Sequence, residues 1–405
     1  MYRLRSFLLL ALCAPATSCA PRARTSAVPA SAWVGTWSAA PQLTEPRNLP
    51  PAPLAAGTLR QVVRLSLGGA TARLRLSNEF GDGPVVVEAA RVADASSDGA
   101  IVAGTERPLS FGGAPGVTIA PGTTAESDAF VANFRPLTDV AITLRLRTVP
   151  AGVTGHPGSR TTSYIAAGDR VAALSLGDAA RTDHWYLISG LEVARPGAAA
   201  VVVLGNSIAD GRGSGTNKQN RWPDNLARRL AADPRTQTVA VLNQGIGGNC
   251  VLRACIGPSG LDRLERDVLR QAGARWLIVS EGVNDIGGAR TAEAAQQVVR
   301  DLTAAYRRIV DQAHARGLRV YGATILPFGG SQYDSPERES ARQAVNTFIR
   351  AGGVFDAVLD LDAAMRDPAQ PNRLRADVDG GDHLHPNEQG YRVMADAIDL
   401  GLFVR

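Results

Sequence analysis

Two hydrophobic patterns divide the chain near residue 198. In the first part, apolar and polar residues alternate over short runs such as TARLRLSN (71–78) and VAITLRLRT (140–148), in which leucines alternate with arginines. Alternation with a period of two predicts strands that bury one face. Glycine pairs and a Pro-Gly step punctuate these runs, and no convincing helical pattern separates them. Residues 33–195 are therefore expected to form an all-β domain of the sandwich or jelly-roll type.

The second part alternates short apolar runs with amphipathic segments of helical period. The apolar runs are VVVLG (201–205), VAVLN (239–243), WLIVS (276–280), LRVYGATI (318–325) and FDAVLDL (355–361). Strands that are separated by helices pair in parallel, and the helices cover both faces of the resulting sheet. We therefore expect residues 198–405 to form an α/β domain, with ligands bound beyond the carboxyl ends of its strands.

Polar and glycine-rich blocks follow these strands at the ends where ligands are expected. The blocks are GNSIADG (205–211), NQGIGGN (243–249), GVND (282–285) and, near the end of the chain, DHLH (382–385). A serine, a glycine-rich turn, an Asn-Asp pair and a histidine are thus predicted to meet at one edge of one sheet.

The four blocks and their order resemble those of the SGNH/GDSL hydrolase superfamily. The resemblance covers roughly residues 199–405 and implies a flavodoxin-like, three-layer α/β/α hydrolase domain with a parallel sheet. Together with the β-rich first half, the chain resembles exported two-domain members of this superfamily that are associated with carbohydrate esters.

The resemblance implies a role for each block. Ser207 corresponds to the nucleophile, His385 to the general base and Asp382 to the carboxylate that orients the imidazole. The backbone N–H groups of Ser207 and Gly248 and the side-chain amide of Asn284 correspond to the oxyanion hole. These residue types suit the chemistry, because a serine hydroxyl needs a base to take its proton and a developing oxyanion needs preorganised donors. The carboxylate holds the imidazole in the right tautomer.

One position departs from the family pattern. Residue 206 is Asn, where the nucleophile block usually has Asp. That Asp is not the carboxylate of the triad, so we predict that activity survives the change. Asp285, in the GVND block, is expected to brace its loop rather than to take part in the chemistry.

The loop LPFGGSQYDSP (326–336) follows the fourth predicted strand at the same edge of the sheet. Its Phe328 and Tyr333 are candidate substrate contacts, and His383 either lines the pocket or points to solvent. The aspartates and histidines of residues 379–385 fit a glycine turn better than a metal site, and the glycine block lacks the spacing of a dinucleotide fingerprint. No metal and no cofactor are therefore expected.

Composition and the N-terminal sequence bear on partners and location. The chain has 405 residues, of which 45% are hydrophobic and 20% charged, and its net charge is +5 with no basic block, so nucleic acid is not an expected partner. Arg3 and Arg5 precede a short apolar stretch, which predicts an export signal and tether in residues 1–25. Cys19 ends a sequence that resembles a lipobox. The protein is therefore expected to be periplasmic, extracellular or anchored to the bacterial envelope through lipidated Cys19.

Cys250 and Cys255 are the two cysteines beyond the export signal. In an oxidising compartment two cysteines this close are expected to form a disulfide. Free thiols are the alternative, and a zinc site would need further ligands.

Together these features predict a serine esterase (EC 3.1.1) that removes acetyl or other short acyl groups from carbohydrate. A lipase, lysophospholipase or arylesterase of the same fold is the alternative within this chemistry. A glycan-binding protein with a catalytically dead hydrolase domain is the alternative from another class. The β-rich domain contains no motif that assigns its role.

Overall fold

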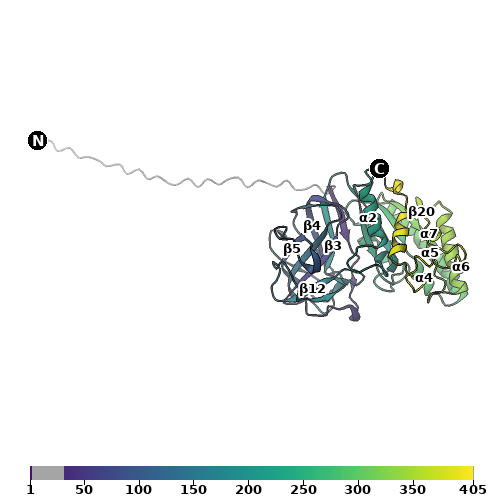
Figure 1. Cartoon of the computed structure of the whole chain (residues 1–405), viewed down its shortest axis with the longest axis horizontal. Helices are drawn as coiled ribbons and strands as arrows, with labels where there is room; N and C mark the ends of the chain where they lie inside the picture. The colour runs from purple at the N-terminus through teal and green to yellow at the C-terminus, as the bar shows by residue number, and fades with distance from the viewer. Residues whose placement is uncertain (2–31, 405) are drawn as a thin grey trace.

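The chain folds into a strand-rich half and a helix-rich half that lie side by side (Figure 1). The structure, a computed structural model, describes Met1 and residues 32–404. The predicted export signal and Cys19 lie outside the described residues. Within the described part of the chain, no helix is long and apolar enough to cross a membrane.

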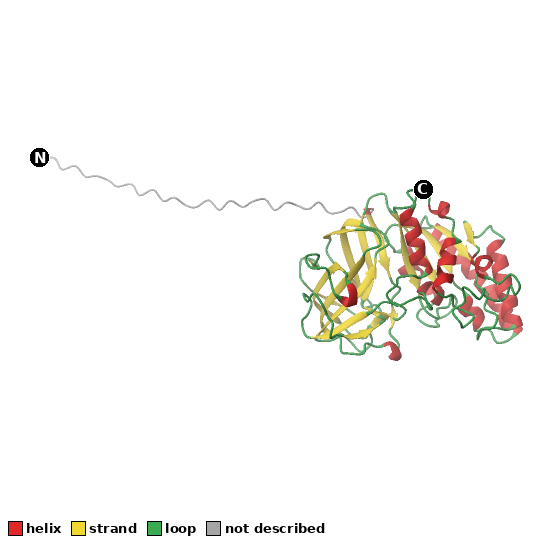
Figure 2. Ribbon diagram, viewed as in Figure 1, coloured by secondary structure: helices red, strands yellow, loops and turns green. Residues whose placement is uncertain are grey.

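Residues 32–195, called here the β-rich half, contain antiparallel strands (Figure 2). One sheet has the order β1 (Trp33–Ser38), β15 (Ile188–Ala194), β4 (Gly69–Ser77) and β8 (Thr124–Glu126), with β9 (Phe130–Phe134) also pairing with β4. A second has the order β13 (Ala180–Thr182), β12 (Ser163–Ala167), β3 (Gly57–Arg64), β10 (Asp139–Thr148), β5 (Val85–Asp94) and β6 (Arg107–Pro108), with β7 (Val117–Ile119) also on β5. A small third sheet contains β14 (Trp185–Tyr186), β11 (Thr154–His156) and β2 (Gln42–Leu43).

The alternating runs form strands as their period predicts. Leu74 and Leu76 of β4 are fully buried, and so are Leu144 and Leu146 of β10, in the other large sheet. All four belong to one apolar cluster, so the two sheets face each other across a shared core. The arginines between the leucines point away from this core, where Arg73 pairs with Glu192 at 2.6 Å.

Residues 199–404, called here the α/β half, contain a five-stranded parallel sheet. Its order is β17 (Val239–Gly245), β16 (Ala199–Gly205), β18 (Ala274–Ser280), β19 (Arg319–Ala323) and β20 (Ala357–Leu359). The helices are α1 (Ser207–Asp210), α2 (Trp222–Ala232), α3 (Gly260–Leu264), α4 (Val283–Gly287), α5 (Ala292–His314), α6 (Pro336–Arg350), α7 (Leu361–Met365) and α8 (Glu388–Asp396). This confirms the predicted fold class, an α/β domain preceded by a β domain.

Strand β16 shows why the half has three layers. Val202 and Leu204 are buried in the cluster that contains Leu302 of α5, whereas Val201 and Val203 are buried in the cluster that contains Leu226 of α2. Alternate residues of one strand thus meet helices on opposite faces of the sheet, which is why the strand is apolar throughout.

Both hydrogen bonds and apolar contacts join the two halves. The N–H of Val241 in β17 donates to Ser66 Oγ at 3.0 Å, and Gln244 Nε2 donates to Ser38 Oγ at 2.7 Å. One apolar cluster includes Trp37 of β1 together with Leu242 of β17. Residues 195–198 also join the two halves directly, because they link β15 to β16. The β-rich half is therefore held against β17, the edge strand of the parallel sheet that contains the predicted site.

Candidate active site

Ser207 is the first residue of α1, directly beyond the carboxyl end of β16. Asn206 caps this short helix, because its Oδ1 accepts a hydrogen bond from the N–H of Ile208 at 3.0 Å. The helix lies tightly on β17: a Cβ at Gly245 would come within 2.4 Å of the backbone nitrogen of Asp210. The strand therefore ends in a turn that leaves the Ser207 side chain at the sheet edge.

His385 joins Ser207 to a carboxylate. Its Nε2 lies 2.8 Å from Ser207 Oγ, and its Nδ1 lies 2.7 Å from Asp382 Oδ2. An ionised carboxylate only accepts, so Nδ1 donates to Asp382, and Nε2 is left as the acceptor for the hydroxyl proton of Ser207. The loop before α8 positions both groups, because Asp382 Oδ1 also accepts from the backbone N–H of His385 at 2.9 Å.

The surroundings favour an ionised carboxylate and a neutral imidazole. Burial opposes the charge of Asp382, but hydrogen bonds from the backbone and imidazole of His385 lower the pKa of Asp382 to about 2. Burial lowers the pKa of His385 below its ordinary value, against the attraction of Asp382, and the charges of Arg212 and Arg160 add to this lowering. A neutral imidazole is the form that can take a proton at neutral pH.

Gly248 and Asn284 lie beside these groups in one cavity. Gly248 has φ +73°, and its N–H donates to no other backbone group of the described chain. Asn284 Nδ2 donates to the carbonyl of Asn249 at 2.7 Å, and its Oδ1 accepts from the Tyr333 hydroxyl at 2.9 Å. These two contacts fix the orientation of the amide, and they leave one amide hydrogen for a ligand.

The cavity has a volume of about 420 Å³, and both halves of the chain line it. From the α/β half come Ser207, Gly248, Asn284, Tyr333 and His385. From the β-rich half come Glu45, Arg47, Asn48, Gly158, Arg160 and His184.

Residues 203–393 match the model of the GDSL-like lipase/acylhydrolase family. These residues, the greater part of the α/β half, form a GDSL-like lipase/acylhydrolase domain. No curated protein matches the chain.

Solved structures similar to this hydrolase each cover about half of it. They include a putative lipolytic protein of the G-D-S-L family from Desulfitobacterium hafniense DCB-2, with 20% identity over 49% of this chain and 97% of that one and a TM-score of 0.36. The acetylxylan esterase Axe2 from Geobacillus stearothermophilus has 21% identity over 50% and 92%, with a TM-score of 0.38. A putative arylesterase from Agrobacterium tumefaciens str. C58 has 17% identity over 50% and 98%, with a TM-score of 0.37.

The departure of this hydrolase at position 206 has a structural reason. Asn206 Nδ2 lies 3.3 Å from a carboxylate oxygen of Glu281, to which it donates, and Glu281 is buried. Burial raises the pKa of Glu281 to about 8, although Arg263, 3.3 Å away, favours the charged form. An Asp at position 206 would lack the Nδ2 donor that contacts both Glu281 and the carbonyl of Ser280.

The structure contradicts one predicted substrate contact of the hydrolase. Phe328 does not line the cavity but is fully buried in the core, 6.4 Å from the Tyr333 ring and 6.0 Å from the Arg342 guanidinium. The loop turns this aromatic side chain inward, where it removes apolar surface from water. Tyr333 does line the cavity, and it also holds the amide of Asn284.

His383 is not among the residues that line the cavity, and its side chain is half exposed. Its Nδ1 lies 2.5 Å from Asp379 Oδ2, so it pairs within its own loop. Among residues 32–404, no group of three or more His, Cys, Asp or Glu side chains is arranged to hold a metal ion.

Cys250 and Cys255 form the predicted disulfide. Asp285 braces the loop that contains Cys250, because its carboxylate accepts from the N–H groups of Val251 and Leu252 at 2.9 and 3.1 Å. Asp285 is thus structural, as predicted. Asn249, whose carbonyl accepts from Asn284, directly precedes Cys250, so the disulfide lies close to the cavity.

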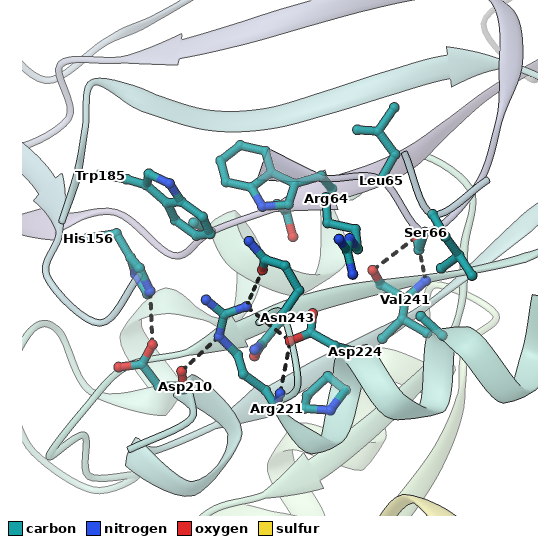
Figure 3. Close-up of a pocket in the computed structure, with 17 residues that line it drawn as sticks. Arg64, Leu65, Ser66, His156, Trp185, Asp210, Arg221, Asp224, Val241 and Asn243 are labelled. Carbon is teal, nitrogen blue, oxygen red and sulfur yellow. Dashed lines mark hydrogen bonds and ion pairs between the residues drawn. The ribbon is translucent and has the colours of Figure 1, made fainter. Parts of the chain in front are cut away.

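Sequence reasoning missed a second histidine–carboxylate pair between the two halves (Figure 3). His156 Nε2, at the end of β11, lies 3.0 Å from Asp210 Oδ1, and its Nδ1 lies 3.0 Å from the carbonyl oxygen of Ala40. Asp210 Oδ2 accepts from the N–H of Gly247, the neighbour of Gly248. Burial would raise the pKa of Asp210, but the charge and hydrogen bond of His156 outweigh it and hold that pKa below the ordinary value.

Arg221, just before α2, completes this boundary beside His156. Its Nε donates to the carbonyl of Asp210 at 3.2 Å, another nitrogen donates to the carbonyl of Ser159, and its guanidinium lies 5.7 Å from the Trp185 ring centroid. Neither His156 nor Arg221 lies in a block of the family, and each has one of its partners in the other half of the chain. A histidine within a short turn-rich segment was the one available signal, and it does not name a partner.

Proposed function

We propose that this protein is a serine esterase that hydrolyses carboxylic esters, with Ser207 as nucleophile, His385 as general base and Asp382 as the carboxylate that orients it. The observation that carries the proposal is the unbroken hydrogen-bond chain from Ser207 Oγ through the imidazole to Asp382, open to a cavity. A serine at this spacing from a neutral imidazole can lose its proton as it attacks.

In the proposed reaction, His385 Nε2 takes the hydroxyl proton while Ser207 Oγ attacks the ester carbonyl. The backbone N–H groups of Ser207 and Gly248 and the free amide hydrogen of Asn284 stabilise the oxyanion that forms. His385 then gives its proton to the leaving alcohol, and the acyl group stays on Ser207. A water molecule, deprotonated by His385, releases the acid and restores the serine.

We propose short acyl groups on carbohydrate as the substrate class. The cavity of about 420 Å³ has a rim of hydrogen-bonding side chains that includes Asn48, His184 and Gln332, which suits a hydroxyl-rich alcohol better than a long acyl chain. Similarity to an acetylxylan esterase points the same way, although similarity to an arylesterase accompanies it.

Acetate release tests the proposal. The native protein, incubated with acetylated xylan, acetylated pectin and simple sugar acetates, is expected to release acetate, and Ser207→Ala is not. Ser340→Ala, an exposed serine on α6, is the matched control and should retain the native rate. A fluorophosphonate probe that labels neither the native protein nor the control would instead indicate a binding protein. Preference for long-chain over acetyl p-nitrophenyl esters would indicate a lipase.

We also propose that the protein is exported. The N-terminal sequence and the disulfide between Cys250 and Cys255 support an oxidising compartment. Fractionation of expressing bacteria tests this: Cys19→Ala should move the protein from the membrane fraction to the soluble periplasmic or extracellular fraction if Cys19 is lipidated. Recovery of the native protein in the cytoplasm would contradict export.

A further inference from the structure

A segment of the β-rich half lines the active-site cavity and is fixed in place there. His156 at the end of β11 is bonded to Asp210, as Figure 3 shows. Two residues later, Gly158 fits so closely that a Cβ would come within 1.8 Å of the Asp210 carboxylate. Ser159 then accepts from Arg221 through its carbonyl oxygen. The backbone that leads to Arg160 is therefore held by three consecutive contacts with the α/β half.

Arg160 occupies a backbone conformation that is unfavourable for its residue type. Its φ is +50°, in the left-handed region that non-glycine residues seldom adopt. Its carbonyl accepts from the N–H of Asn217, and Asn217 Oδ1 in turn accepts from the N–H of Thr162 at 2.8 Å. Hydrogen bonds to Asn217 therefore fix the turn at Arg160 and just after it. Backbone strain of this kind persists where the surroundings impose it, and it is frequent at functional sites.

The guanidinium of Arg160 lines the cavity without a partner. In the described part of the chain it makes no hydrogen bond and no ion pair, and its Nε is buried and unsatisfied. Other arginines at the rim differ: Arg47 is bonded to Glu45 at 2.9 Å, and Arg212 lies 3.8 Å from Asp382. A buried donor without a partner is costly, so an unpaired guanidinium that faces a cavity is suited to a ligand that supplies the acceptor.

We propose that Arg160 binds an anionic group of the substrate, so that the preferred substrates are acyl esters of saccharides that bear a carboxylate, sulfate or phosphate near the ester. A guanidinium presents a rigid fork of donors that matches the oxygens of such groups. The inference rests on the proposed esterase activity and names its substrate class. Arg160 acts here as a specificity-determining residue, outside the bond-making steps.

Matched sugar acetates test this inference. An acetylated methyl glucuronoside is compared with the same compound in which a neutral uronamide replaces the carboxylate, and acetylated methyl glucoside 6-sulfate and 6-phosphate form two further arms. The native enzyme is expected to show a kcat/KM at least about tenfold higher for one or more of the anionic esters than for the uronamide, as one charge-assisted contact would give. The arm with the largest ratio identifies which anion is used.

Variants assign the preference to Arg160. Arg160→Gln, which keeps an unbranched side chain at the strained turn, should bring the anionic-to-neutral ratio close to one. Arg160→Lys should keep part of it, because the charge remains but the fork is lost, and it serves as the test if Arg160→Gln fails to fold. Arg135→Gln is the matched control, an exposed arginine of the β-rich half outside the cavity lining, and should keep the native ratio.

The outcomes separate this inference from the proposed function. A native enzyme that hydrolyses p-nitrophenyl acetate but shows a ratio near one in all three arms overturns the inference alone. A native preference that survives in Arg160→Gln, or is unchanged in Arg160→Lys when that variant is the test, also overturns it. A protein that hydrolyses no ester and is not labelled by fluorophosphonate overturns both.

Discussion

Two of the histidine–carboxylate pairs meet α1 and are built differently: His385 contacts Ser207 at its start, and His156 contacts Asp210 at its end. His385 belongs to the α/β half and faces one carboxylate and one hydroxyl, and the side chain of its partner Asp382 is 45% exposed. His156 belongs to the β-rich half and faces a carboxylate and a carbonyl, and both it and its partner Asp210 are buried.

The difference lies in what the second ring nitrogen contacts. A hydroxyl can donate to His385 Nε2, so that ring can be neutral and can accept a proton. The Ala40 carbonyl oxygen accepts from His156 Nδ1, and Nε2 contacts the buried Asp210 carboxylate, so neither ring nitrogen of His156 is left for a hydroxyl. The same pair of residue types therefore makes the proposed base in one place and a fixed structural contact, called here the clamp, in the other. Each prediction below tests this comparison.

The largest effect is expected at the proposed base. His385→Ala, like Ser207→Ala, should lower kcat/KM for p-nitrophenyl acetate by about 10⁴- to 10⁶-fold, because the nucleophile then lacks a proton acceptor. Thermal unfolding should change little, since neither side chain contributes much core packing. Steady-state kinetics together with a melting curve test this. Retention of a tenth of the native activity in His385→Ala would contradict the assigned role.

Loss of the clamp should have a smaller effect on activity and a larger one on stability. His156→Asn leaves the buried Asp210 carboxylate without its imidazole partner, and loss of one partner of a buried pair typically costs about 3–5 kcal/mol in the free energy of unfolding. The N–H of Gly247 depends on Asp210, so the neighbouring Gly248 should be less well placed, and kcat should fall by about 10- to 100-fold with little change in KM.

A double-mutant cycle makes this result specific. Asp210→Asn in the His156→Asn background should cost less than the sum of the two single changes, because the unpaired charge is removed. His314→Asn is the matched control, since its partner Asp356 is also a carboxylate but the pair is solvent-exposed. If His156→Asn were as inactive as His385→Ala and still as stable as the native protein, the two pairs would not differ as described.

The pH dependence of kcat/KM should reflect the proposed base. The pKa of His385 is lowered from the ordinary value of 6.5, and the neutral imidazole is the active form, so activity should persist below pH 6.5 and decline only as pH falls through the lowered pKa. The charge of Arg160 contributes to this lowering, so Arg160→Gln should move the acidic limb to higher pH. Arg135→Gln should leave the limb where it is. A native limb above pH 6.5 would contradict the environment described for His385.

Restoring the usual family residue should not improve this enzyme. Asn206→Asp removes the Nδ2 donor to Glu281 and to the carbonyl of Ser280, so we expect a loss of about 1–3 kcal/mol in stability and at most a several-fold fall in kcat. Asn206→Ser can still cap α1 and adds no charge, so it separates loss of the amide donor from the effect of the added negative charge. A rise in turnover by orders of magnitude in Asn206→Asp would show that position 206 limits the native reaction.

The smallest effect is expected from the disulfide. The double change Cys250→Ser and Cys255→Ser should lower the free energy of unfolding by about 2 kcal/mol, as expected for closure of a short loop. Activity should change by less than about threefold, because Asp285 still holds the N–H groups of Val251 and Leu252. A large loss of activity would mean that the disulfide, rather than Asp285, positions Asn249 and Gly248.

The sequence predicts what is encoded locally. The alternating runs around Leu74 and Leu144 form strands, and the buried runs of the α/β half form the parallel sheet, because hydrophobic period reports which faces are buried. Ser207, His385 and Asp382 could be named because they lie in short blocks at strand ends.

Long-range contacts explain what the sequence could not predict. His156 meets Asp210 across 54 residues and across the boundary between the halves, and nothing near either residue encodes that approach. Phe328 was misassigned because an aromatic residue in a loop at the site edge has the same local sequence whether it faces a ligand or the core. Arg160 is identified by the absence of a partner, which only three-dimensional coordinates reveal.

The four-residue link between β15 and β16 has a practical consequence for attempts to produce the α/β half alone or to fuse it to another protein. Truncation of the chain at residues 195–198 would remove the part of the cavity lining that contains His156 and Arg160, and it would expose Leu242. The α/β half alone should therefore be poorly soluble and should hydrolyse esters more slowly than the full chain. Grafting this active site onto another binding module would require moving the strands of the first half with it.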